Sequence, residues 1–173
     1  MAKNILEIKN LTFSFHTYGG VVKSVRDVSF NVREGEILGI VGESGCGKSV
    51  TSQCILKLNP EPPGFFEGGS IKYKGEEIIT KTDREMRKIR GVEIGFIFQD
   101  PMTSLNPVYP VGKQVQEAIL LHQKVSKEEA KQRVIDIFRA VGIPEPEKRY
   151  KSYPHQLSGG LRQRVMIGMA MVC

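Results

Sequence analysis

Gly42-Glu43-Ser44-Gly45-Cys46-Gly47-Lys48-Ser49 is the stretch that decides the fold of this chain. It follows an apolar run at 37–41 and precedes a segment without helix breakers at 50–58. Strand, glycine-rich loop and helix, in that order, form the context that a phosphate-binding loop requires. Glycine lets the backbone wrap tightly enough for its N–H groups to point at an anion, and the following helix N-terminus adds unpaired donors. We therefore predict a nucleotide site here rather than a merely flexible surface loop.

The loop residues have different expected roles. Lys48 is expected to reach the terminal phosphates, and the Ser49 hydroxyl is expected to bind Mg²⁺. Cys46 lies beside a helix N-terminus, so we expect its alkylation to block nucleotide binding and ATP to protect it. The alternative is that cysteine only fills a position that needs a small side chain. The other expected nucleotide contacts are Gly42, Glu43, Ser44, Gly45, Gly47 and Val50.

Length and composition fit a globular protein of one compact domain, or of one domain with a subdomain. The chain has 173 residues, of which 40% are apolar and 25% are charged. Its longest mostly apolar run, 165–173, is far too short to span a membrane, and no signal peptide is visible. The three cysteines have no metal-type spacing, and their odd number argues against a disulfide framework. We expect a cytosolic protein that can bind a membrane partner.

The net charge of +6 raises the question of a nucleic acid partner. The basic residues are spread along the chain, with one loose cluster at 84–90. A solvated helix face explains that cluster better than a binding surface does. We therefore predict no nucleic acid partner.

Hydrophobic patterning predicts a mixed α/β fold. Apolar runs and alternation between turn residues predict strands at 5–15, 25–32, 37–41, 69–73, 76–79 and 92–99. Helices are expected at 50–58, 83–90, 111–123, 126–141 and after Ser158, the last of them buried nearly all round. Ser126 and Glu129 form a capping box, and Gly142 is the expected helix stop. We divide the chain into an antiparallel β layer with the phosphate-loop core (1–99), a helical subdomain (100–157) and a final helix (158–173).

A second motif is Ser158-Gly159-Gly160-Leu161-Arg162. Ser158 is a good helix N-cap, and two glycines in the first turn leave the N–H groups uncovered. This predicts a second anion-binding helix end, with an ordinary capped helix as the alternative.

The order of these motifs resembles one family. A phosphate loop, then Phe98-Gln99-Asp100-Pro101, then Leu157-Ser158-Gly159-Gly160, is similar to the nucleotide-binding subunit of an ABC transporter. The resemblance covers essentially the whole chain and implies a P-loop NTPase fold of the ABC type, with ATP and Mg²⁺ as cofactors. The stretches 102–107 and 153–155 are similar to the ATPases of oligopeptide, dipeptide and nickel importers. Residues 162–167 resemble the first of the two paired ATPases in such systems.

The resemblance also implies roles for single residues. Lys48 and Gln99 would be catalytic, and Gln99 would sense Mg²⁺ and the attacking water. The helix end at Ser158-Gly159-Gly160 would contact the γ-phosphate of ATP bound by the opposite subunit in a head-to-tail dimer. Arg162 and Gln163 would orient this motif rather than react.

One aromatic side chain near the first hairpin usually stacks on adenine in this family. Tyr18 is our candidate, with Phe15 or His16 as alternatives. A core or turn role is the competing interpretation for each of the three.

The implied partners are integral membrane permease subunits, a second homologous ATPase and, indirectly, an extracytoplasmic solute-binding protein. The location implied is peripheral, at the cytoplasmic face of the cell membrane. The family's catalytic glutamate strand and switch histidine would follow Cys173, so the fold is expected to be incomplete at its C-terminus. We therefore expect ATP binding with weak or absent turnover, and self-association through an exposed sheet edge.

Three other classes remain to be weighed. A DNA-repair or chromosome ATPase would carry long coiled coils or zinc cysteine pairs, which this sequence lacks. A GTPase would need an Asn-Lys-x-Asp motif to read guanine, and none occurs. A non-catalytic fragment that still holds nucleotide stays an alternative.

Overall fold

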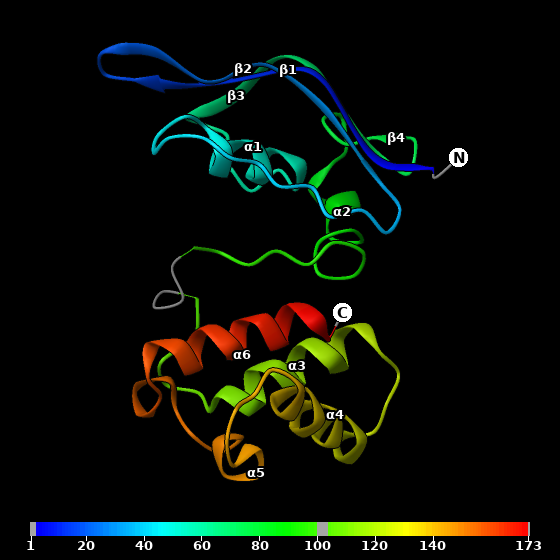
Figure 1. The fold of residues 1–173 in the computed structure, drawn as a ribbon, viewed down its shortest axis with the longest axis vertical. Helices are drawn as coiled ribbons and strands as arrows, with labels where there is room; N and C mark the ends of the chain where they lie inside the picture. Colours follow the sequence, from blue (N-terminus) through cyan, green and yellow to red (C-terminus); the bar gives the residue numbers. More distant parts are fainter. Residues whose placement is uncertain (1–2, 100–103, 173) are drawn as a thin grey trace. The chain divides into compact units, whose positions relative to one another are not determined.

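The computed structural model describes residues 3–99 and 104–172 (Figure 1). Its internal contacts divide the chain into two compact units, Met1–Arg87 and Lys88–Cys173. Each unit is described by itself. The domain boundaries expected at 99/100 and 157/158 stay predictions.

The first unit is built on an antiparallel sheet of four strands. The strands are β1 (Asn4–Thr17), β2 (Gly20–Arg33), β3 (Gly64–Tyr73) and β4 (Glu76–Glu77), in the order β2-β1-β3-β4. Four of the predicted strands are thus confirmed, although β2 and β3 begin five residues earlier than expected. The sheet buries apolar side chains of β1, and the Phe13 ring packs edge-on against Phe15 and Phe66 at 5.2 and 4.9 Å between centroids.

Two helices complete this unit. Helix α1 (Lys48–Ile55) follows the phosphate loop, as predicted. Helix α2 (Asp83–Met86) begins with a capping box between Thr82 and Glu85. It is shorter than the expected helix at 83–90: α2 ends at Met86, and Arg87, still in the right-handed helical conformation, is its C-cap.

The predictions of strands at 37–41 and 92–99 are wrong for this structure. Residues 36–43 form no strand, and the side chains of Ile37 and Val41 are almost fully exposed. In the second segment, the described residues form only an isolated bridge between Arg90 and Ile94. The apolar pattern indicates β propensity, but a strand also needs a neighbour for its backbone hydrogen bonds. Neither segment has such a neighbour within 3–99 and 104–172.

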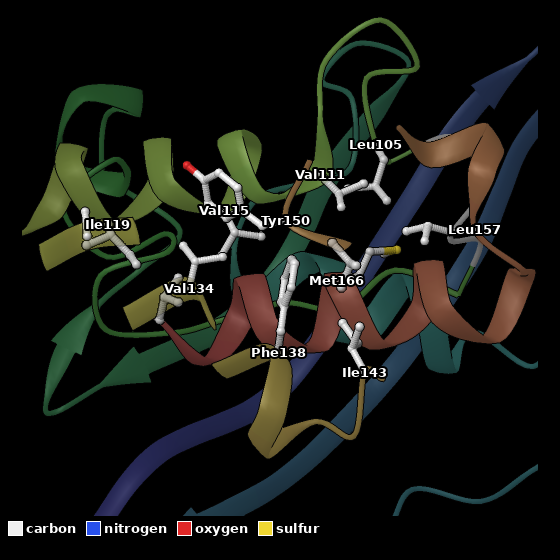
Figure 2. Packing of buried hydrophobic residues seen from close by; sticks show 13 residues of the cluster. Leu105, Val111, Val115, Ile119, Val134, Phe138, Ile143, Tyr150, Leu157 and Met166 are labelled. Atoms are coloured by element: carbon white, nitrogen blue, oxygen red, sulfur yellow. The ribbon is translucent and has the colours of Figure 1, made fainter. Parts of the chain in front are cut away.

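The second unit is helical. It contains α3 (Val111–His122), α4 (Lys127–Ala140), α5 (Pro146–Arg149), the 3₁₀ turn η1 (Pro154–Gln156) and α6 (Gly159–Met171). Helix α6 lies along α3 and α4 (Figure 1). Figure 2 shows the shared core, which consists of Leu105, Val111, Val115, Ile119, Ala130, Val134, Phe138, Ile143, Tyr150, Leu157, Val165, Met166 and Val172.

Most local signals at the ends of these helices act as predicted, but the expected capping box of α4 forms only in part: the Glu129 carboxylate pairs with Arg133 at 2.7 Å instead of returning to the Ser126 backbone. The Ser126 hydroxyl accepts a hydrogen bond from the Glu129 N–H at 3.1 Å, and Gly142 has a φ of 74° just after α4. Gly112 in α3 leaves room for the Tyr150 ring, since a Cβ there would lie 2.3 Å from it. Helix α6 is not buried all round, contrary to expectation, because the side chain of Met171 is 58% exposed.

The short strand β4 is held in place by a carboxylate. Glu77 accepts hydrogen bonds from the Ser70 hydroxyl at 2.5 Å and from the N–H groups of Ile71 and Ile79 at 3.0 and 3.2 Å. Partial burial raises the pKa of Glu77, but these hydrogen bonds outweigh it and bring the pKa below its ordinary value of 4.5. The ionised form therefore stabilises the fold.

We expect Glu77→Gln to lower the free energy of unfolding at pH 7 by about 1.5–3 kcal/mol, the range for hydrogen bonds to a charged group. The pKa of Glu77 is lower in the folded chain than in the unfolded chain, so the ionised carboxylate stabilises the fold. This stabilisation is complete above the unfolded-state pKa of about 4.5 and is lost as the pH falls below it. The difference between wild type and variant should therefore shrink in acid. Urea unfolding between pH 3 and 7 measures this difference.

The control is the neighbouring variant Glu76→Gln. The Glu76 side chain is 72% exposed in its ion pair with Lys81, so this substitution should lower the free energy of unfolding by less than about 1 kcal/mol. A pH-independent difference for Glu77→Gln would contradict the account.

Candidate nucleotide-binding site

The phosphate loop enters helix α1 through left-handed glycines. Gly45 and Gly47 have φ values of 80° and 94°, and Gly47 is the N-cap of α1. The carbonyl of Gly47 accepts hydrogen bonds from the N–H and the hydroxyl of Thr51, at 2.8 and 2.9 Å. The first N–H groups of an α-helix have no partner within the helix, so those at the start of α1 are available to an anion.

A β-bulge in β2 meets the loop. The pairing of β1 with β2 steps from Phe13–Val25 to Ser14–Lys23, which leaves Ser24 as the extra residue. A Cβ added to Gly47 would lie 2.2 Å from the carbonyl oxygen of Ser24. Only glycine therefore allows the loop to approach the sheet this closely. Nothing in the sequence around Ser24 indicates the bulge.

The side chain of Lys48 folds back over the loop. Its ammonium donates hydrogen bonds to the carbonyl oxygens of Gly42 at 2.8 Å and Glu43 at 2.6 Å. It also lies 3.6 Å from the Cys46 sulfur. The positive charge is thus held by the loop backbone, in the place where the loop can direct it at an anion.

The remaining loop positions are accessible. Gly42, Glu43, Ser44, Gly45, Cys46 and Ser49 are exposed, and Val50 is half-buried. Ser49 is the second residue of α1, and a hydroxyl oxygen suits Mg²⁺ when phosphate oxygens and water complete the coordination. Within the described residues, no three His, Cys, Asp or Glu side chains gather in a way that could hold a metal by themselves. The donor chemistry therefore fits a Mg²⁺ ion that arrives with a nucleotide.

The three aromatic candidates lie at different places along the first hairpin. Tyr18 is fully exposed in the turn, and His16 is already stacked on Phe65 at 4.4 Å. Phe15 is half-buried and pairs with Val22, two residues from the bulge that touches the loop. At about 3.3 Å per residue, Phe15 is about 7 Å from Ser24 along the strand, whereas Tyr18 lies beyond about 13 Å.

The second predicted anion site lies in the second unit. The Ser158 hydroxyl accepts a hydrogen bond from the Leu161 N–H at 3.3 Å and caps α6, as predicted. Gly159 and Gly160 are the first two helical residues, and a Cβ added to either would meet no atom within 4 Å. The start of α6 is therefore open.

Gln99 also belongs to the second unit and is exposed. The residues that follow it, Asp100, Pro101, Met102 and Thr103, lie outside the described residues. Lys48 belongs to the first unit, so the predicted role of Gln99 at the metal stays a prediction.

The two described cysteines differ sharply in accessibility. Cys46 is exposed, whereas Cys54 is fully buried in α1. Burial raises the pKa of Cys54 to about 12, against the opposing effect of a hydrogen bond from the Asn59 amide. A protonated, buried thiol is unreactive toward alkylating reagents.

We expect N-ethylmaleimide to label Cys46 and spare Cys54 in the native protein. Mg-ATP at 100 times its dissociation constant should slow the labelling of Cys46 by about 100-fold, because only the empty loop can react. Mass spectrometry of peptides from a Cys173→Ser chain measures both rates. Urea supplies the control, since both thiols should react once the chain unfolds. Equal labelling of Cys46 with and without Mg-ATP would discard the prediction.

The described helices include none that is both long enough and apolar enough to cross a membrane.

Comparisons with known proteins agree with the motif order. The sequence pattern of the ABC transporter family matches residues 25–173. The oligopeptide transport ATP-binding protein OppD of Bacillus subtilis (strain 168) is 55% identical over 167 residues, which make up 96% of this chain and 47% of OppD. The dipeptide transport ATP-binding protein DppD of the same strain is 52% identical over 171 residues, 99% of this chain and 51% of DppD. The chain thus spans about half the length of the curated relatives it matches.

Solved structures agree with this match. The ATP-binding cassette MJ0796, in a dimeric post-hydrolysis state bound to ADP and Pi, has a TM-score of 0.85 and 28% identity, covering 96% of this chain and 69% of that chain. The cassette cbiO1 of Clostridium perfringens, part of the ABC transporter complex cbiONQ, has a TM-score of 0.74 and 25% identity, covering 98% and 61%. The expected fold class, an α/β nucleotide-binding domain of the ABC type, is confirmed, and this chain belongs to the ABC transporter family.

Proposed function

We propose that this chain is the ATP-binding part of a subunit that powers a peptide importer at the cytoplasmic face of a membrane. The observation that carries the proposal is the Lys48 ammonium, held at 2.8 and 2.6 Å by two carbonyls of a glycine loop that opens a helix. A cation and free amides directed at one place favour a polyphosphate, and Ser49 supplies an oxygen for its Mg²⁺. The peptide transport names of OppD and DppD support the substrate class.

We propose that the adenine ring of ATP stacks on an aromatic side chain of the first hairpin, β1–β2. The register of β1 and β2 favours Phe15 over our first candidate, Tyr18, because Phe15 lies closer to the bulge that touches the loop. The ring of His16 is stacked face to face on Phe65, whereas the contact of Phe15 with Phe13 is edge-on at 80° between the rings. Phe15→Ala should therefore weaken Mg-ATP binding by about tenfold, as loss of one aromatic stack does, while Tyr18→Ala leaves it unchanged. The reverse result in a calorimetric titration would return the role to Tyr18.

We further propose that two ATPase subunits clamp ATP head to tail. The open helix end at Ser158 is a second candidate anion site, and it belongs to a different compact unit from the Lys48 loop. In a dimer, this helix end could bind the phosphates of ATP held by the loop of the other copy. The dimeric state of MJ0796 supports the pairing of two such subunits.

Mixing two defective chains tests the clamp. Lys48→Ala removes the loop cation and keeps the helix end, whereas Ser158→Arg blocks the helix end and keeps the loop. Neither chain alone should form an ATP-dependent dimer. Their mixture should do so, because one of its two composite sites is intact. Sedimentation with and without Mg-ATP separates this dimer from any association through apolar surface. A mixture that behaves like its components would refute the head-to-tail clamp.

The permease contact is proposed for the second unit. A groove of about 590 Å³ runs along α3, and its lining includes the apolar side chains of Ala118, Leu121 and Met169 and the charged side chains of Lys113 and Glu117. Its lining also includes Tyr109 and, from the stretch 102–107 that is similar to importer ATPases, Ser104 and Asn106. The other lining residues are Gln114 and His122. A short amphipathic helix of the permease that carries both positive and negative charges is the occupant that fits this lining.

Crosslinking tests this placement. A Leu121→Cys chain, whose residue 121 is 72% exposed in the wild type, should crosslink to the permease but not to the solute-binding protein, which contacts this chain only indirectly. Absence of a permease crosslink would count against this placement.

A further inference from the structure

Two β-bulges flank the same part of β1, the middle strand between β2 and β3. In β2 the extra residue is Ser24, whose carbonyl oxygen closely approaches Gly47 of the phosphate loop. In β3 the register shifts just after the pair Thr12–Gly68, which leaves Glu67 as the extra residue. A bulge re-aims the side chain of its extra residue. The Glu67 carboxylate can therefore reach across the sheet instead of standing in the regular ladder.

The Glu67 carboxylate connects three strands. The Ser14 hydroxyl of β1 donates a hydrogen bond to its Oε1 at 2.5 Å, and the Lys23 ammonium of β2 lies 3.0 Å from its Oε2. Ser14 is fully buried, and the Glu67 side chain is only 24% exposed. The hydrogen bond from Ser14 and then that from Lys23 hold the pKa of Glu67 below its ordinary value of 4.5. The carboxylate is therefore ionised at neutral pH, and both bonds are charge-assisted.

Lys23 is the residue directly before the bulged Ser24, and it is held at two points. Glu67 holds its ammonium, and the Arg26 Nε–H donates to its carbonyl at 3.2 Å, across the bulge. Within the described part of the chain, β2 has a neighbouring strand on one side only. A bulge interrupts the hydrogen bonds to that single neighbour. The side chains of Glu67 and Arg26 therefore supply contacts that the backbone ladder lacks at Ser24.

The position of Ser24 matters to the phosphate loop. The loop and the bulge approach so closely that a Cβ on Gly47 would lie 2.2 Å from the Ser24 carbonyl oxygen. Lys48 and the first amides of α1 directly follow Gly47. Glu67, Lys23, Ser24 and Gly47 thus form a continuous series of contacts that leads from β3 to the groups expected to bind phosphate. A shift of the bulge would reach the loop through this series.

We propose that Glu67 is a positioning residue for the nucleotide site. Through Lys23 it holds the Ser24 bulge against Gly47, and this keeps the phosphate loop in the shape that binds a polyphosphate. The proposal deepens the proposed function and rests on it for ATP as the ligand. Glu67 acts through the sheet and is assigned no contact with ATP.

The test combines calorimetric titration with NMR of the Gly47 amide. Glu67→Ala should weaken Mg-ATP binding by about tenfold and shift the Gly47 amide resonance in the nucleotide-free chain. Lys23→Ala should cause a similar loss, and because Lys23 is half-exposed this variant keeps the fold. The double variant should bind no more weakly than either single variant, since both substitutions break the same contact.

Glu7→Ala is the matched control. Glu7 lies on β1, its side chain is 29% exposed, and it pairs with Lys9 at 3.8 Å, away from both bulges that flank Ser14. It should leave the Mg-ATP affinity and the Gly47 amide unchanged. If Glu67 only stabilised the sheet, Glu67→Ala would lower the melting temperature but leave both readouts as in the control. That pattern, or losses that add up in the double variant, would overturn the proposal.

The NMR measurement separates this proposal from the proposed function. If the wild-type chain bound no Mg-ATP, the proposed function would fail, but the Gly47 amide would still report on the loop. A shift of this resonance in both Glu67→Ala and Lys23→Ala, absent in Glu7→Ala, would then support the positioning role. An unshifted resonance in the first two variants would overturn it.

Discussion

The Gly47→Ala chain should bind Mg-ATP about 30- to 700-fold more weakly than wild type, because a left-handed backbone cost of about 1–2 kcal/mol and a steric clash of similar size together oppose the binding conformation of the loop. Gly47 has a φ of 94°, and the added Cβ would lie 2.2 Å from the Ser24 carbonyl oxygen. A backbone atom cannot swing aside as a side chain can. The loop must therefore move, and it carries Lys48 and the first amides of α1 with it.

Gly35→Ala is the matched control for this experiment. Gly35 also has a positive φ, 75°, but a Cβ there would meet no atom within 4 Å. The Gly35→Ala chain should lose some stability, because alanine disfavours a left-handed backbone, but it should keep the wild-type affinity for Mg-ATP. Calorimetric titration of both variants decides the matter. If Gly47→Ala bound Mg-ATP within a few-fold of wild type, the close approach of loop and bulge would have no functional importance.

Phe138→Ala should destabilise the helical unit by about 3–5 kcal/mol, the range for truncating a large core aromatic. Phe138 is fully buried. In Figure 2 it lies in the middle of the labelled core, with Val115 and Val134 on one side and Met166 on the other. Removing the ring leaves a cavity that side chains from three helices cannot all close.

The measurement is urea unfolding followed by far-UV circular dichroism, which reports mainly on helices. Leu121→Ala is the control in the same unit, because Leu121 is 72% exposed and should change stability by less than about 0.5 kcal/mol. A loss below about 1 kcal/mol for Phe138→Ala would show that this core is not what stabilises the unit.

Local signals in the sequence were enough to predict α1, α3, α4 and α6 and the start of the site. Ser126 and Ser158 cap α4 and α6, and the glycine loop precedes α1, because each of these features depends on residues only a few positions apart. The antiparallel pairing of β1 with β2 is also nearly local, since a short turn joins the two strands.

Features that depend on distant residues could not be predicted in this way. The segments 37–41 and 92–99 have strand patterns, but a sheet forms only where a neighbouring strand supplies partners. The bulge at Ser24 and the reach of Arg162 to Pro154 follow from backbone geometry that no short pattern encodes. The sequence indicates only an aromatic residue near the first hairpin, with Tyr18 as the first candidate, whereas strand register favours Phe15.

The most direct test of the account is a calorimetric titration of Mg-ATP into the wild-type chain and into Lys48→Ala. The account predicts saturable heat with one nucleotide per wild-type chain and no saturation in the variant, because Lys48 supplies the cation of the loop. Absence of saturable heat in the wild type, or equal binding by both chains, would contradict it.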